Sequence, residues 1–345
     1  YPIQIPLSNN FETSMATQNM GNFIIVEICS EGLSGFGEVD PRPHITGETL
    51  YSAAEVLKNY LIPAVIGKSI YDIEGIHKCA IDIGVYDLLG KIISTPVYNL
   101  LGGKKIKPVK LNAWAGINSN IDKTIDTIVN KIEHGFDLAA KIKVGNDFCS
   151  EIDLVKRLSK VLPERMDFII DANQAWNYSS ARKYIAQFAE NGVTIAEQPV
   201  YYDDLESMKK LTRTMPVAIM ADESIWCGRD AFNLAKTDTA SMFNLKLIKC
   251  GGLYPGKKFI DVAESAGISC MIGSTIQTGI SAAAQAHIAA ASDVIELADI
   301  VIPSEFMDTD IAEGFMVERG EVILSDKPGL GLIVDKQLIS RFIVS

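Results

Sequence analysis

The chain has 345 residues, of which 48% are hydrophobic and 22% are charged, and this composition is sufficient to bury a large core, by default in two domains. The formal net charge is −11 and no run of basic residues is present, which excludes a nucleic-acid surface of the usual positive kind. No apolar stretch of about 18 residues occurs, so we expect no membrane span and no secretion signal.

The first hundred residues predict strands followed by helices. Three short segments rich in β-branched residues or bounded by glycine are expected to be strands: Pro2–Leu7, Asn22–Cys29 and Gly35–Val39. Apolar residues at helical intervals then predict helices over Thr49–Ile66 and Cys79–Ile93. This order indicates a compact α+β domain over residues 1–110, which we expect the C-terminal segment 311–345 to complete.

From about Val109 the pattern changes to a repeated alternation of strand, loop and helix. Eight segments are candidate strands: Leu111–Ala115, Leu138–Val144, Asp167–Asp171, Thr194–Glu197, Ala218–Asp222, Met242–Lys246, Ser269–Ile272 and Ile295–Val301. Amphipathic segments lie between them, as the crossover connections of parallel strands require. We therefore expect residues 111–310 to form a (β/α)8-type barrel.

Four charged residues end successive candidate strands at nearly constant steps of 26, 25 and 24 residues: Asp171, Glu197, Asp222 and Lys246. Each step is about one strand-plus-helix unit, so the side chains should meet at the C-terminal rim of the barrel. Three oxygen ligands without a histidine or cysteine cluster favour Mg²⁺ over zinc. The alternative, that the acids are helix N-caps, fits the aspartates but explains Glu197 poorly.

Two lysines, Lys141 and Lys143, alternate with Ile142 on the second candidate strand and should both face the barrel interior. We interpret Lys143 as a general base that loses its proton readily, because Lys141 and burial disfavour a second positive charge. The alternative is a pair of solvated lysines at the rim. Lys246, four strands further on, favours the first interpretation because it puts a lysine on the opposite side of the barrel.

A cation between two amines suggests abstraction of a proton next to a carboxylate. The cation would neutralise the resulting enediolate, one lysine would remove the proton, and the other would return one from the opposite face. Such a reaction inverts a stereocentre.

Motifs along almost the whole chain carry a family resemblance: Ala80–Leu88 with Pro96–Gly103, the Lys-x-Lys pair, the three acids, and Lys246 ahead of Gly251-Gly252. With these motifs the chain resembles the muconate lactonizing enzyme subgroup of the enolase superfamily. The resemblance implies an α/β fold, a (β/α)7β modified TIM barrel with an α+β capping domain. It also implies one Mg²⁺ per subunit on Asp171, Glu197 and Asp222, and acid/base lysines at Lys143 and Lys246.

Within the subgroup, Lys246–Tyr254 and Cys270–Ser274 most resemble dipeptide epimerases of the L-Ala-D/L-Glu type. This likeness implies inversion at Cα of the C-terminal residue of an L-Ala-X dipeptide, with Lys141, Gly273 and Ser274 beside the substrate. Asp299 matches the first carboxylate of an Asp-x-Asp pair that binds the substrate ammonium, and Val301 replaces the second. Asp308 and Asp310 form a second Asp-x-Asp pair and are the alternative ammonium site.

The first loop of the capping domain is expected to set the preference for residue X. Met15 and Ala16 belong to this loop, which should close over the substrate together with the segment 40–47. Ala16 stands where epimerases that prefer Ala-Glu carry an arginine. Without that cation X need not be acidic, so the predicted substrate is L-Ala-L-Glu or a dipeptide with a broader X.

Other activities use the same metal and lysines. The rivals are an o-succinylbenzoate synthase with N-acylamino acid racemase activity and a muconate cycloisomerase. A non-catalytic carboxylate-binding protein is a further alternative, but binding alone needs no base on both faces. The expected partner is a small-molecule dipeptide, and an apolar barrel exterior could support a homo-oligomer. The six cysteines are scattered without Cys-x-x-Cys spacing and are expected to be buried free thiols, which predicts a cytoplasmic location.

Overall fold

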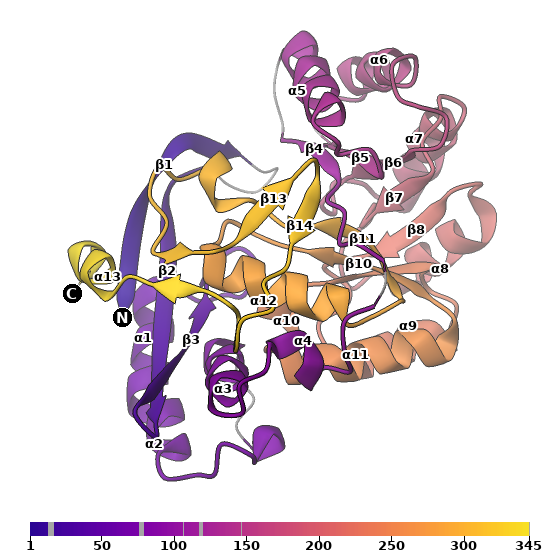
Figure 1. Ribbon diagram of the computed structural model, residues 1–345. Coiled ribbons are helices and arrows are strands. Elements are labelled where there is room, and N and C mark those ends of the chain that lie inside the picture. The colour runs from indigo at the N-terminus through magenta and orange to yellow at the C-terminus, as the bar shows by residue number, and fades with distance from the viewer. Residues whose placement is uncertain (13–16, 76–78, 106, 117–119, 146, 345) are drawn as a thin grey trace.

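The computed structural model describes residues 1–12, 17–75, 79–105, 107–116, 120–145 and 147–344. Its N-terminal strands form an antiparallel sheet in the order β1-β2-β3, beside a larger parallel sheet of eight strands. The three N-terminal strands are β1 (Pro2–Glu12), β2 (Thr17–Ser30) and β3 (Leu33–Val39). In Figure 1 they are drawn in indigo to one side of the barrel strands, as the predicted two-part organisation requires.

The short helices after this sheet are α1 (Leu50–Val56), the π-helical turn η1 (Leu57–Leu61), α2 (Ile62–Val65), the 3-10 turn η2 (Ile73–Gly75), α3 (Cys79–Ile92) and α4 (Val97–Leu100). The helix predicted over Thr49–Ile66 is confirmed from Leu50 to Val65, and the turn Leu57–Leu61 within it is π-helical. Thr49 is the N-cap, as its side chain accepts a hydrogen bond from Ser52 N. The π-helical turn precedes Pro63, which has no amide to continue the α-helical ladder.

Helix α3 lies directly on β3. An added Cβ at Gly35 or Gly37 of β3 would overlap backbone atoms of α3 at Gly84 or Ala80. The strand can approach the helix this closely only because these positions lack side chains. Asp87 of α3 accepts hydrogen bonds from Phe36 N of β3 and from Leu330 N near the C-terminus, both at 2.8 Å.

The barrel has eight parallel strands that follow one another in sequence order from β4 to β11. The strands are β4 (Ala113–Ala115), β5 (Ala139–Lys143), β6 (Asp167–Asp171), β7 (Ile195–Glu197), β8 (Ala218–Ala221), β9 (Met242–Leu245), β10 (Ser269–Gly273) and β11 (Ile295–Asp299). The helices between them are α5 (Ile121–Glu133), α6 (Phe148–Leu158), α7 (Tyr178–Ala189), α8 (Leu205–Thr214), α9 (Gly228–Lys236), α10 (Leu247–Cys250), α11 (Leu253–Ala266) and α12 (Gly279–Ala290). Asn112 N donates to Ala298 O at 2.8 Å and links the first strand to the last. This architecture confirms the (β/α)7β barrel.

The inside of the barrel is filled by one apolar layer. Its buried members come from seven different strands: Ala139, Ile169, Ile195, Met220, Met242, Met271 and Leu297. Side chains of a strand alternate between its two faces, so Ile170 joins the outer core under the helices while Asp171 returns to the inner face. The acids therefore stand above a dry apolar floor.

The C-terminal segment runs back to the N-terminal sheet. It contains η3 (Pro303–Glu305), β12 (Ala312–Glu313), β13 (Met316–Glu318), β14 (Glu321–Ile323), β15 (Ile333–Val334) and α13 (Lys336–Phe342). Ile343 bridges to Ile3 of β1, and Val344 N donates to Pro2 O at 3.0 Å, so the two chain ends lie side by side (Figure 1). The domain boundaries at 110 and 310 stay a prediction.

Two buried carboxylates from the first hundred residues accept hydrogen bonds at the N-termini of barrel helices. Asp82 of α3 accepts from the backbone amides of Leu253 and Tyr254, the first residues of α11. Glu38 at the end of β3 accepts from Thr278 N at 2.9 Å, from Thr278 Oγ1 at 2.5 Å and from Ser281 N at 3.1 Å, at the start of α12. These acids join the capping region to the barrel and satisfy helix amides that have no partner within the helix.

The buried carboxyl group of Glu38 should make the stability of the fold depend on pH. Burial raises the pKa of Glu38 to about 8, from an ordinary value of 4.5. Between these values the folded chain holds a proton that the unfolded chain has lost, so its free energy of unfolding falls as pH rises, by at most about 1.4 kcal/mol per pH unit. We expect Glu38→Gln to remove this contribution, so that urea unfolding from pH 5 to 8 gives a shallower decline than in the wild type. Parallel declines would contradict the assignment.

All six cysteines are free thiols, as predicted. The expectation of burial is confirmed for Cys270, whereas Cys79, Cys227 and Cys250 are half-buried, and it is wrong for Cys29 and Cys149, which are exposed. Cys29 lies near the end of β2, and Cys149 lies in the first turn of α6, where side chains can point to solvent. Within the described part of the chain, no helix is long and apolar enough to cross a membrane.

Candidate active site

The three acids predicted to bind a metal stand together at the C-terminal rim of the barrel. Asp171 and Glu197 are the last residues of β6 and β7 and pair in register, and Asp222 directly follows β8. All three side chains are at most 2% exposed. Burial and the nearby charges of Asp171 and Asp222 raise the pKa of Glu197 to about 8. The even spacing in the sequence thus becomes a cluster of mutually repelling carboxylates.

The two predicted acid/base lysines contact this cluster from opposite sides. Lys143 Nζ, at the end of β5, lies 3.0 Å from Asp171 Oδ2. Lys246 Nζ, directly after β9, lies 2.6 Å from Asp222 Oδ2. Three strands, β6 to β8, separate the two lysines in the sheet. The predicted arrangement of one amine on each side of the acids is therefore present.

Lys141 lies deeper in the barrel than a rim lysine and pairs with three carboxylates. Its Nζ is 2.7 Å from Glu197 Oε2, 2.9 Å from Asp299 Oδ2 and 3.5 Å from Asp171 Oδ2. The alternative of a solvated pair of rim lysines is wrong, because the side chains of Lys141 and Lys143 are only 8% and 14% exposed.

Charge pairing outweighs burial for most of these groups. Burial disfavours the ammonium of Lys246, but the carboxylates of Asp222, Glu197 and Glu223 overcome it and raise the pKa of Lys246. Burial likewise opposes the charged form of Asp222, yet Lys246 and Lys249 hold the pKa of that carboxyl well below its usual range. The cluster is a dense array of opposite charges in a buried site, where burial and charge pairing have opposing effects on each pKa.

The chemistry of the acids fits a hard divalent cation. Their oxygens are buried and mutually repelling, and a divalent cation would compensate the charge that lysines compensate here. Within the residues the structure describes, no three acidic, histidine or cysteine groups surround a common point closely enough to hold an ion as they stand. The lysine ammonium groups instead form ion pairs with carboxylate oxygens, among them Asp171 Oδ2 and Asp222 Oδ2.

Sequence reasoning missed two polar residues beside Asp171 and Asp222. Asn173 accepts a hydrogen bond from Lys143 Nζ at 2.6 Å and donates to Glu223 Oε1 at 3.2 Å. Burial, followed by the charges of Asp222 and Asp171, raises the pKa of Glu223 to about 7. Both residues lie within two positions of a predicted ligand, and this adjacency was the available signal.

Gln198, which follows Glu197, supports the segment that carries Asp222. Its Oε1 accepts from Asp222 N at 2.9 Å and from Ser224 N at 3.1 Å. The side chain is fully buried, and its backbone has a φ of +35°, in the left-handed region. Such a conformation in a non-glycine residue is costly and occurs often at functional sites.

Asn244 on β9 was also missed, and it lies against Gly273 on β10, which the sequence predicted to lie beside the substrate. Asn244 Nδ2 donates to Glu197 Oε1 at 2.7 Å and is completely buried. An added Cβ at Gly273 would overlap Asn244 Oδ1. Gly273 therefore leaves the space that Asn244 needs to hold Glu197.

The predicted ammonium ligand Asp299 ends β11 and pairs with Lys141. Ser274 Oγ donates to Asp299 O at 2.6 Å and accepts from Val301 N at 2.8 Å, so Ser274 fixes the end of this strand. Val301, the residue in place of a second carboxylate, is buried. Asp299 thus belongs to the charged cluster.

Asp308 and Asp310 have partners elsewhere. Asp308 Oδ1 accepts from Ser8 Oγ of β1 at 2.7 Å. Asp310 Oδ2 accepts from Gly279 N at the start of α12 at 2.9 Å. Met15 and Ala16 lie outside the described residues, so their predicted role in the substrate pocket stays a prediction.

The segment 40–47 is tied to both the N-terminal sheet and the barrel. Arg42 Nη1 donates to Gln18 Oε1 and its Nε donates to Asp40 Oδ2, each at 2.5 Å. Asp40 also accepts a hydrogen bond from the Thr275 side chain, in the loop after β10. These contacts connect the start of β2 to the loop after β10 at the rim of the barrel.

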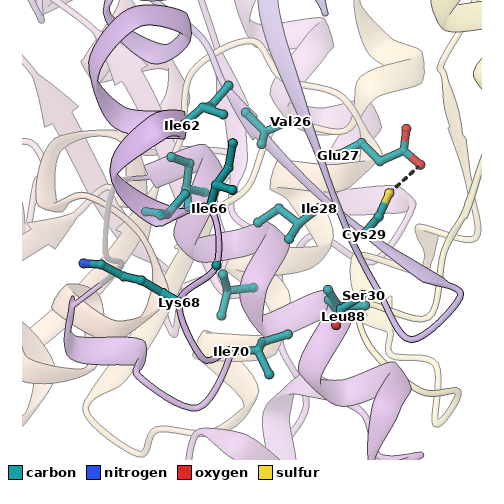
Figure 2. A pocket seen from close by; sticks show the side chains of 14 residues that line it. Val26, Glu27, Ile28, Cys29, Ser30, Ile62, Ile66, Lys68, Ile70 and Leu88 are labelled. Atoms are coloured by element: carbon teal, nitrogen blue, oxygen red, sulfur yellow. Dashed lines mark hydrogen bonds between the residues drawn. The ribbon is translucent and has the colours of Figure 1, made fainter.

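Two apolar cavities lie away from the charged cluster, on the outer face of the N-terminal sheet. One has a volume of about 560 Å³ and lies between β2 and the segment 62–70 (Figure 2). The other, of about 640 Å³, borders β2, α1 and Tyr1. None of the predicted site residues lines either cavity.

An eight-stranded barrel with acids and lysines at its C-terminal rim is typical of a barrel enzyme. Residues 3–102 match the family "Mandelate racemase / muconate lactonizing enzyme, N-terminal domain", and residues 125–338 match "Enolase C-terminal domain-like". The chain therefore belongs to the mandelate racemase/muconate lactonizing enzyme family of the enolase superfamily.

Characterised relatives span nearly the whole chain. A hydrophobic dipeptide epimerase from Enterococcus faecalis is 35% identical, covering 95% of this chain and 96% of its own. An L-Ala-D/L-Glu epimerase from Bacillus subtilis is 32% identical, with coverage of 96% and 94%. This chain is an enzyme, and isomerase activity of the epimerase type fits these relatives.

Solved structures agree with the fold. An N-succinyl Arg/Lys racemase from Bacillus cereus superimposes with a TM-score of 0.94 at 28% identity, covering 100% of this chain and 96% of that one. The dipeptide epimerase from Enterococcus faecalis, in complex with Mg and the dipeptide L-Leu-L-Tyr, gives a TM-score of 0.90 at 36% identity, with coverage of 96% and 97%.

Proposed function

We propose that this chain is a Mg²⁺-dependent dipeptide epimerase. It inverts Cα of the C-terminal residue of L-Ala-X dipeptides, where X is glutamate or a broader set of residues. The reaction is a two-base 1,1-proton transfer through an enediolate. The observation that carries the proposal is the pair of lysines on opposite sides of one carboxylate cluster, with Lys143 on Asp171 and Lys246 on Asp222.

Three residues of the chain are the proposed metal ligands. Asp171, Glu197 and Asp222 would hold Mg²⁺, which would supply positive charge against the negative charge that develops on the substrate carboxylate. A bound magnesium ion and dipeptide in the relative from Enterococcus faecalis support this choice of cofactor. One ion per subunit is the proposed stoichiometry.

The lysines carry out the proton transfers. With the substrate Cα between them, one Nζ removes the Cα proton and the other Nζ delivers a proton to the opposite face, so the configuration inverts. Asn173 holds Lys143 by a hydrogen bond of 2.6 Å, which keeps its Nζ directed at the site. The apolar layer below the acids limits water and strengthens each charge interaction.

Asp299 is the proposed partner of the substrate ammonium, with Lys141 as its neighbour in the same ion pair. This pairing also favours a second candidate function. Because Lys141 already pairs with Asp299 and Val301 cannot supply a second carboxylate, an N-acylated amino acid without an ammonium is the alternative substrate. The racemase from Bacillus cereus is a relative of that kind.

A screen of Cα deuterium exchange distinguishes these functions. The enzyme is incubated with Mg²⁺ in D2O with an L-Ala-X library and, separately, with N-succinyl amino acids, and incorporation is read by mass spectrometry. We expect exchange with inversion for a subset of the dipeptides. Exchange confined to N-succinyl substrates would favour the racemase, and no exchange with either set would contradict both.

Gly273→Ala tests the support of the proposed metal ligand Glu197. The new methyl group would displace Asn244, which donates to Glu197 Oε1. We expect Mg²⁺ to bind about 10-fold more weakly, as is typical when a residue orienting a ligand is lost, while the fold persists. Isothermal titration calorimetry measures the affinity.

The matched control is Gly228→Ala on α9, where the nearest atoms to the added Cβ are 3.7 Å away. This variant should bind Mg²⁺ like the wild type. Unchanged affinity in Gly273→Ala would show that Asn244 does not position Glu197.

A further inference from the structure

We propose that Lys249, which lies outside the predicted acid/base pair, is a positioning residue that orients Asp222 for metal binding. The inference rests on the proposed function, because it takes Asp222 to be a metal ligand. Lys249 lies on α10, three residues after Lys246.

Lys249 contacts Asp222 twice. Its Nζ donates to Asp222 Oδ1 at 2.5 Å and to the backbone carbonyl oxygen of the same residue at 2.6 Å. Bonds to both the side chain and the main chain of one residue limit rotation of the carboxylate about its Cα–Cβ bond. Asp222 N is held at the same time by Gln198 Oε1 at 2.9 Å.

The two oxygens of Asp222 are divided between two lysines with different environments. Oδ1 is bound by Lys249, whose side chain is 2% exposed, and Oδ2 by Lys246, whose side chain is 14% exposed. The Lys246 side is therefore the more open one, where a substrate and an ion can approach. By holding Oδ1, Lys249 directs Oδ2 toward that open side.

The burial of Lys249 is costly for the fold, which favours a specific role for its ammonium group. Burying an ammonium costs several kcal/mol unless charged partners compensate it. A methionine of similar shape would fill the same volume without this cost but would leave Asp222 Oδ1 and its carbonyl oxygen without their Lys249 donor.

If Lys249 only stabilised the fold, it would make the same contacts. The test must therefore measure metal affinity. We would titrate Mn²⁺, a spectroscopic substitute for Mg²⁺, into the wild type, Lys249→Met, Lys249→Arg and Asp222→Asn, and read free Mn²⁺ by electron paramagnetic resonance. Thermal unfolding in EDTA reports separately whether each variant is folded.

We expect Lys249→Met to bind Mn²⁺ 10- to 100-fold more weakly than the wild type. Lys249→Arg, which keeps donors but not the length of lysine, should fall between the two. Affinity within threefold of the wild type in folded Lys249→Met would overturn the inference. If the methionine variant does not fold, the arginine variant decides in the same way, since unchanged affinity there also overturns it.

Two controls separate structural loss from positioning. Lys257→Met on α11 removes a surface lysine paired with Asp261. Glu38→Gln changes a buried carboxylate whose hydrogen-bond partners are Thr278 and Ser281, not Asp222. Both should bind Mn²⁺ as the wild type does, and weaker binding in either would overturn a specific role for Lys249. Failure of the proposed function looks different, because Asp222→Asn would then keep its Mn²⁺ affinity.

Discussion

The Lys246→Ala enzyme is expected to lose about two to four orders of magnitude in kcat for epimerisation, while still exchanging the Cα proton of one substrate stereoisomer. Lys246 contacts the carboxylate cluster from the side opposite to Lys143, so its removal leaves one face without an acid or base. A positioned acid or base contributes about 10² to 10⁴-fold to the rate. Deuterium incorporation into each separated stereoisomer, followed by NMR, measures the asymmetry.

Lys143→Ala provides the complementary measurement and should retain exchange only with the other stereoisomer. Lys257→Ala, at a surface lysine on α11, serves as the control and should epimerise at the wild-type rate. If each single lysine variant exchanged both stereoisomers equally, a two-base mechanism with these residues would be wrong. Loss of exchange with both isomers in a folded variant would instead indicate that one lysine performs both transfers.

Replacing Glu197 with glutamine should abolish the response to Mg²⁺ without unfolding the protein. Glu197 is fully buried between the charges of Asp171 and Asp222, so its carboxylate is costly in the metal-free chain. We expect Glu197→Gln to be about as stable as the wild type in EDTA. A ligand present at 100 times its dissociation constant stabilises a fold by about 2.7 kcal/mol, and this increment should disappear.

Differential scanning calorimetry with and without Mg²⁺ gives the result directly, and kcat/KM should fall by about 10³-fold in parallel. Glu38→Gln is the matched control, because it also removes a buried carboxylate, but one at the end of β3 that bonds to the start of α12. Its stability changes, yet its increment from Mg²⁺ should equal that of the wild type. A normal Mg²⁺ increment in Glu197→Gln would exclude Glu197 as a ligand.

The barrel and the acid cluster could be predicted because the short apolar strand segments and the regular spacing of the acids at their ends indicate the same architecture. Asp171, Glu197 and Asp222 each end a short apolar strand, and parallel strands joined by helices must bring their carboxyl ends to one rim. The pairing of Asp171 with Glu197 in neighbouring strands follows from this rule without any knowledge of side-chain contacts.

Other features depended on packing that the sequence pattern does not encode. The helix expected over Thr49–Ile66 contains a π-helical turn before Pro63 that the pattern did not predict. Lys249 has the same short-range surroundings as many exposed lysines, and only the approach of α10 to Asp222 buries it. Asn244 looked like an ordinary strand residue, although its amide holds Glu197.

The sequence by itself determined the fold class, the family and the identity of the acids and lysines at the barrel rim, because these depend on periodicity and on residue type at the ends of strands. Only the tertiary structure decided which oxygen each lysine holds. Lys141 meets Asp299 across 158 positions of chain, and Lys249 rather than Lys246 takes Asp222 Oδ1. The direction of a buried charged side chain depends on which oppositely charged groups from other strands lie nearest to it. The spacing of residues along the sequence does not reveal which of these groups it contacts.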